Sequence, residues 1–124
     1  MNNKQLPIWR DANRLLLEVE QAVRHFPKYH KYTLGTEMRQ QAMKICQLVS
    51  RAWRNKADAP QALPRLVQAV DDLKIQLQLG KELHVFQNFA EFERLAELTV
   101  QVGKQSGGWL RHVQAAQPEV SRHA

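Results

Sequence analysis

The sequence predicts an all-α protein, and more specifically an antiparallel up-and-down four-helix bundle. Apolar residues recur at steps of three and four in four segments of about 20 residues, which is the period of an amphipathic helix. Connections of about three to eight residues favour antiparallel neighbours. Strands are not expected, because the chain has no sustained alternation of period two. We expect one domain over residues 1–124, with a core at about residues 7–115 and flexible ends.

The first predicted helix covers residues 7–26. Pro7 suits a first helical turn, where its missing amide hydrogen would have no helical partner. Pro27 ends the helix because the residue before a proline disfavours helical angles. The apolar stripe consists of Ile8, Ala12, Leu15, Leu16, Val19, Val23 and Phe26.

The second predicted helix begins at Leu34, after a polar link over residues 27–33, and ends around Asn55. Thr33 or Thr36 is expected to cap its amino end. With Thr33 as the cap, Glu37 interacts favourably with the positive pole of the helix dipole. The apolar stripe consists of Leu34, Met38, Ala42, Ile45, Val49, Ala52 and Trp53.

The third predicted helix begins near Leu63, with Pro60 just before it and Pro64 in the first turn, where proline is tolerated. Gly80 is a weak point that costs about 1 kcal/mol relative to alanine, but the pattern resumes through Leu83. The apolar stripe consists of Leu63, Leu66, Val67, Val70, Leu73 and Leu77.

The fourth predicted helix follows a turn at residues 85–88. Gly103, Gly107 and Gly108 indicate sites of close helix approach or a bend, and Pro118 ends any helix that reaches it. The apolar stripe consists of Phe92, Leu95, Ala96, Thr99, Val102, Ser106, Trp109 and Val113.

Some apolar residues exceed what one internal seam requires. A second apolar face of this kind favours self-association over simple filling at the edge of the bundle. These surplus residues are Ile75, Leu79, Leu83, Phe86, Leu98 and Leu110.

Composition predicts a cytoplasmic protein with no membrane span. The longest apolar run covers residues 15–17, far short of the roughly 20 residues that a spanning helix needs. The polar, mixed-charge start does not resemble a secretory signal. The single cysteine, Cys46, lies among apolar neighbours, so we expect a buried, inert thiol rather than a reactive one.

Catalytic and metal-binding patterns are not visible, so the chain is not expected to be an enzyme or to carry a cofactor. No two histidines have the helical spacing that places both on one metal, and no glutamate is followed by histidine three residues later. The acids near Glu91 are interpreted as a solvated face rather than a carboxylate metal site. No nucleophile and base form a recognisable pair.

Positive charge is concentrated in one part of the chain. Residues 21–56 hold eight basic residues and one acid, whereas residues 57–97 hold four basic residues and seven acids. This asymmetry suggests a polyanionic partner, although a solvated, solubilising face explains part of it.

The second helix carries a basic stripe opposite its apolar stripe. Gln40, Lys44, Gln47, Arg51 and Arg54 follow steps of four and three, which places them along one face. Such side chains suit contacts with phosphates and indicate RNA or DNA binding. The candidate nucleic-acid-binding residues are Arg24, Lys28, Lys31, Arg39, Lys44, Arg51 and Arg54.

Two segments resemble a known family. Residues 26–39 (FPKYHKYTLGTEMR) and residues 103–110 (GKQSGGWL) are similar to the accessory variability determinant (Avd) proteins of diversity-generating retroelements. That family is related to the four-helix-bundle proteins of ribosomal RNA intervening sequences. The Thr-Leu-Gly at residues 33–35 favours the retroelement branch, and the resemblance extends over about residues 8–113.

The resemblance implies a ring-like homopentamer with a basic surface that binds nucleic acid and associates with a reverse transcriptase. The implied role is assistance to mutagenic copying of a template RNA, with all polymerase chemistry in the partner. The alternative is an intervening-sequence type of bundle that acts as a protein-interaction or structural module without a reverse-transcriptase partner.

Overall fold

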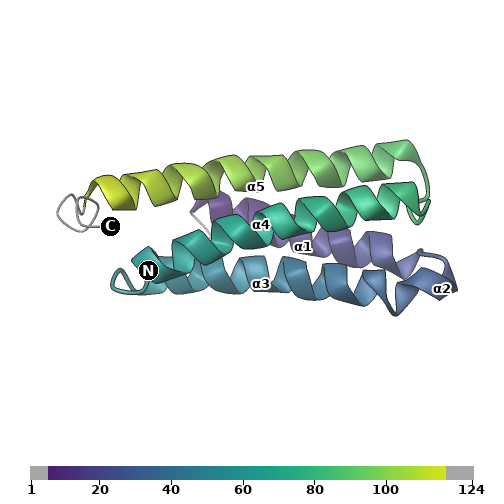
Figure 1. The fold of residues 1–124 in the computed structure, drawn as a ribbon, viewed down its shortest axis with the longest axis horizontal. Helices are drawn as coiled ribbons and strands as arrows, with labels where there is room; N and C mark the ends of the chain where they lie inside the picture. The colour runs from purple at the N-terminus through teal and green to yellow at the C-terminus, as the bar shows by residue number, and fades with distance from the viewer. Residues whose placement is uncertain (1–5, 117–124) are drawn as a thin grey trace.

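Four long helices and one single-turn helix make up the described part of the chain, residues 6–116 of a computed structural model (Figure 1). The helices are α1 (Pro7–Arg24), α2 (Lys28–Lys31), α3 (Leu34–Arg54), α4 (Ala59–Glu82) and α5 (Phe89–Ala115). The long helices run alternately in opposite directions, and α1 and α4 each pack against both α3 and α5. This arrangement confirms the predicted all-α, antiparallel four-helix bundle.

The core lies between the four long helices and is built from the predicted stripes. Burying each large apolar side chain contributes about 1.5–3 kcal/mol, so the stripes fix the rotation of every helix about its own axis. The largest fully buried side chains include Leu15, Val19, Met38, Ile45, Val49, Leu63, Leu66, Val70, Leu73, Leu77 and Leu95. Among the described residues, no helix has the length and hydropathy needed to cross a bilayer.

The predicted polar link at residues 27–33 contains a helical turn, α2. The backbone N–H groups of His30 and Lys31 donate to the Pro27 carbonyl at 2.9 and 3.0 Å. None of its four residues is buried, so no apolar period could reveal it. The Thr33 hydroxyl donates to the His30 carbonyl at 3.3 Å. Thr33 is therefore the residue before α3, as one alternative expected, but its side chain does not cap that helix.

The predicted start of the third helix near Leu63 is wrong, because α4 begins at Ala59. Ala59 and Ala62 are buried, and they continue the apolar stripe by one turn with side chains too small to dominate the pattern. Pro60 lies in the first turn, where its missing N–H has no helical acceptor.

The end of α4 closes with a helix-terminating motif in which His84 adopts a positive φ of 57°. Its N–H donates to the Lys81 carbonyl, and the Val85 N–H donates to the Gly80 carbonyl, both at 3.1 Å. These are the two bonds of a Schellman motif, whose left-handed position glycine usually occupies.

The predicted turn at residues 85–88 leads into α5, which begins at Phe89. The Asn88 side chain accepts a hydrogen bond from the Glu91 N–H at 2.8 Å, and the Glu91 carboxylate accepts one from the Gln87 N–H at 3.1 Å. Glu91 is therefore a buried cap and not part of a solvated acidic face. The predicted stop at Pro118 and the flexible ends lie outside the described residues.

The glycines of α5 differ in what surrounds them. A Cβ on Gly103 would lie 3.3 Å from Val70 of α4, so Gly103 marks a close helix approach. Gly107 and Gly108 would meet only the Arg111 side chain, at 3.4 and 3.8 Å, and α5 continues through both. They are not sites of helix approach.

The surplus apolar residues divide into two groups. Ile75, Leu79 and Leu83 are exposed, and their spacing of four aligns them along the outer side of α4. Phe86, Leu98 and Leu110 pack against the core, so for these three, filling at the edge of the bundle was the better interpretation.

We expect Gly35→Ala and Gly107→Ala to change stability in opposite directions. A Cβ on Gly35 would lie 2.7 Å from Cγ1 of Val23, whose branched side chain has little rotamer freedom. The Gly35 variant should lose about 1–3 kcal/mol of stability, and the Gly107 variant should gain up to about 1 kcal/mol from helix propensity. Urea unfolding followed by circular dichroism measures both. A Gly35 variant as stable as the parent would contradict the close packing of α1 on α3.

Candidate nucleic-acid interface

The outer face of α3 presents the predicted basic stripe. The helix buries Met38, Ile45 and Val49 against its neighbours, so residues on the opposite side of the helix point to solvent. Every member of the stripe is exposed, namely Gln40, Lys44, Gln47, Arg51 and Arg54.

A hollow of about 360 Å³ between α3 and α4, here called the basic hollow, gathers part of this stripe. Lys44, Gln47, Leu48 and Arg51 of α3 line it together with Arg65 of α4. Three cationic side chains and one amide thus surround the hollow, and no carboxylate lines it. This composition suits an anion such as phosphate.

The cations of the basic hollow are available to a ligand. Within residues 6–116, none of Lys44, Arg51 and Arg65 forms an ion pair; the pairs found there involve other basic residues. Each of the three residues is exposed, so a phosphate can reach it without displacing an internal partner.

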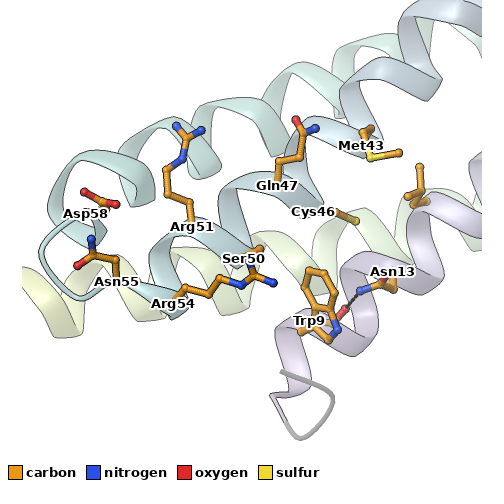
Figure 2. A pocket seen from close by; sticks show the side chains of 11 residues that line it. Trp9, Asn13, Met43, Cys46, Gln47, Ser50, Arg51, Arg54, Asn55 and Asp58 are labelled. Atoms are coloured by element: carbon orange, nitrogen blue, oxygen red, sulfur yellow. Dashed lines mark hydrogen bonds between the residues drawn. The ribbon is translucent and has the colours of Figure 1, made fainter. Parts of the chain in front are cut away.

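A second depression, here called the α1–α3 groove, has a volume of about 530 Å³. In Figure 2, Arg54 extends along it toward Trp9 of α1, while Arg51 and Gln47 extend from the other edge of α3. Asp58 lies at one end of the groove. The stripe therefore contributes residues to depressions on both sides of α3. Lys44 lines the basic hollow, Arg54 lines the α1–α3 groove, and Arg51 lines both.

Arg39 does not present an unpaired charge. Its Nε donates to Oε1 of Glu20 on α1 at 2.7 Å, and both side chains are partly exposed. The pair fastens α1 to α3 and cancels the charge that the sequence pattern assigned to a phosphate. Arg39 is therefore the weakest of the predicted binding residues.

The remaining predicted residues lie at the end of the bundle where α1 turns into α2. Arg24 and Lys28 are exposed, and Lys31 is half-buried with its Nζ 5.9 Å from the centre of the Tyr32 ring. They are separate from the basic hollow, because α3 runs from this end toward the opposite end of the bundle (Figure 1).

Arg65 is the residue that sequence reasoning missed. It belongs to the segment at residues 57–97, in which acids outnumber bases, so its local charge environment pointed away from the basic stripe. Only the antiparallel packing of α4 on α3 brings it beside Lys44 and Arg51. The available signal in the sequence was an arginine near the start of the helix that follows the basic stripe and packs antiparallel to it.

Other chemistry is sparse in the described part of the chain. Residues 6–116 contain no group of three histidine, cysteine, aspartate or glutamate side chains arranged to hold a metal ion. Cys46 is buried on the α1 side of α3, and its Sγ donates to the Ala12 carbonyl at 3.3 Å.

No protein-family model and no curated protein matches the sequence.

The Cys46 thiol should react slowly in the folded protein. Burial raises its pKa from 9.0 to about 11, which lowers the thiolate fraction near pH 8 by about 100-fold relative to the unfolded chain. Labelling with a thiol-specific chromogenic reagent should therefore be at least that much slower before urea is added than after. Because the raised pKa favours the protonated folded state, stability should fall as pH rises from about 9 to about 11. Equal labelling rates with and without urea would contradict the burial.

Proposed function

We propose that this protein is a non-enzymatic, oligomeric nucleic-acid-binding accessory protein. The observation that carries the proposal is the basic hollow, where Lys44, Arg51 and Arg65 from two helices surround a space lined by no carboxylate. These exposed cations repel one another across the hollow, and a bound polyanion would relieve that repulsion.

The geometry favours the phosphate backbone as the bound group. Arginine guanidinium groups make paired hydrogen bonds to phosphate, lysine supplies a point charge, and Gln47 adds a neutral donor. Exposed cations on a helix face fix position and give no base readout. Binding is therefore expected to be salt-dependent and largely independent of sequence, with RNA and DNA both accepted.

The family resemblance supports a more specific proposal. We propose that the protein forms a homopentamer in the cytoplasm and assists a reverse transcriptase during retroelement-directed sequence diversification. Finding a reverse-transcriptase gene and a template repeat next to this gene would support that role. Finding the gene inside a ribosomal RNA gene would support the intervening-sequence branch instead.

Binding should respond to the three cations of the basic hollow. If about 6–10 phosphates are contacted, affinity should fall by at least about a thousandfold between about 50 and 200 mM salt. Replacing Lys44, Arg51 and Arg65 together by glutamine should reduce the slope of log affinity against log salt by up to about three. Fluorescence anisotropy with a labelled oligonucleotide at several salt concentrations measures this slope.

A matched variant controls for net charge. Lys74, which pairs with Asp71, and Lys104 and Arg111 lie on α4 and α5, outside the basic hollow. Replacing the three by glutamine removes the same formal charge. This control should keep most of the affinity and slope. Equal losses in the two variants would mean that only the total charge matters, and no binding by the parent at low salt would remove the proposal.

Self-association has its own supporting observation. Ile75 on the outer side of α4 is 67% exposed, and with Leu79 and Leu83 it forms an apolar stripe that a second copy of the chain can cover. The intervening-sequence alternative needs only this protein-contacting surface.

The α4 stripe should control the oligomeric state. Replacing Ile75 and Leu79 by lysine should convert an oligomer into a monomer, because charged groups cannot be buried unpaired at an apolar contact. Leu17→Lys, on an equally exposed position of α1, should leave the mass unchanged. Sedimentation velocity reads the mass. A monomeric parent protein, or an oligomer that survives both substitutions on α4, would rule out this surface.

A further inference from the structure

The turn between α1 and α3 exposes two aromatic rings that lie outside the apolar core. Tyr29 is 84% exposed and Tyr32 is 69% exposed, whereas Phe26 in the same turn is buried. Phe26 anchors the turn through an edge-on contact with Phe86, at 5.5 Å between ring centres. Phe26 thus packs the turn against the core, and neither tyrosine contributes to that packing.

The backbone that carries these rings is held in place. Helix α2 is closed by the bonds to the Pro27 carbonyl, and the Thr33 hydroxyl ties the His30 carbonyl to the start of α3. Gly35 of α3 lies against this segment, with an added Cβ at contact distance, 3.4 Å, from the His30 carbonyl oxygen. A ring presented by a fixed backbone loses little entropy when a ligand packs on it.

The segment that carries the two rings is cationic, which favours an anionic ligand. The chain from residue 21 to residue 36 contains no acid and includes Arg24, Lys28 and Lys31. Of the carboxylates that flank this stretch, Glu20 is paired with Arg39, and Glu37 is exposed in the first turn of α3. Lys31 lies beside the Tyr32 ring, so a cation and an aromatic surface meet at one point.

We propose that Tyr29 and Tyr32 form a stacking platform for unpaired nucleobases, so that the protein prefers single-stranded over double-stranded nucleic acid. This inference rests on the proposed function and names its ligand class. Aromatic rings bind unpaired bases by stacking irrespective of sequence, while neighbouring cations hold the phosphates between those bases. A duplex keeps its bases stacked inside, so it offers this platform only phosphates.

The test compares a single strand and a duplex on two double variants. Replacing Tyr29 and Tyr32 by leucine removes the stacking surface, and replacing them by phenylalanine keeps it without the hydroxyls. With oligothymidylate of about 20 nucleotides, a length above the usual site size, the leucine variant should bind at least about tenfold more weakly than the parent. The phenylalanine variant should bind like the parent, and duplex affinity should be the same for all three proteins. Thermal unfolding confirms that both variants are folded.

The outcomes separate this inference from the proposed function. A parent protein that binds neither probe overturns both. A parent that binds, together with a leucine variant that keeps its affinity for the single strand, overturns only the platform. Retained strand affinity with a changed oligomer mass in the leucine variant assigns the tyrosines to a protein contact, which also overturns it. Parallel losses for strand and duplex assign them to a general effect on the basic end of the bundle and reject stacking.

Discussion

The burial of the apolar stripe of α3 between α1 and α4 is the constraint on which the surface chemistry depends. Rotating α3 by one residue, about 100°, would move Lys44 into the buried place of Ile45 in one direction, or Ile45 into the exposed place of Lys44 in the other. Each exposed large apolar side chain costs about 1.5–3 kcal/mol, and each buried, unpaired charge costs several more. The core therefore dictates which residues of α3 meet solvent. The basic face follows from that register and needs no interaction of its own.

A second contact sets how far α3 and α4 slide along each other. The Gln41 side chain donates to the Ala69 carbonyl of α4 at 2.9 Å. Because the helices are antiparallel, moving one turn along α3 from Gln41 corresponds to moving one turn back along α4 from Ala69, which reaches Arg65. Arg65 thus lies about level with Lys44 of the basic stripe. One side-chain hydrogen bond helps to assemble the basic hollow.

Periodicity was sufficient for the fold but not for the site. The recurrence of Leu, Val and Ile at steps of three and four defined four helices, because large apolar side chains have to share one face. Ala59 escaped notice because small residues weigh little in such a pattern, and α2 escaped because a single exposed turn has no period. The exposed face of α3 was predictable, as the complement of its buried face. Two features of the site could not be predicted from the sequence: the presence of Arg65 in the basic hollow, and the ion pair between Arg39 and Glu20. Both depend on contacts between helices that are distant in sequence.

The distribution of carboxylates explains why positive charge persists where it does. Glu18 pairs with Arg14 and Arg94, and Glu20 pairs with Arg39, so the acids of α1 neutralise bases on α1, α5 and the first half of α3. The second half of α3 faces no such acid apart from Asp58 at the end of the α1–α3 groove. The helix rises about 25 Å between Leu34, next to the tyrosines, and Arg51. At about 3.4 Å per stacked nucleotide, a strand of about seven nucleotides spans that length. Under the proposed function, a strand of this length would be long enough to place bases at the tyrosines and phosphates in the basic hollow.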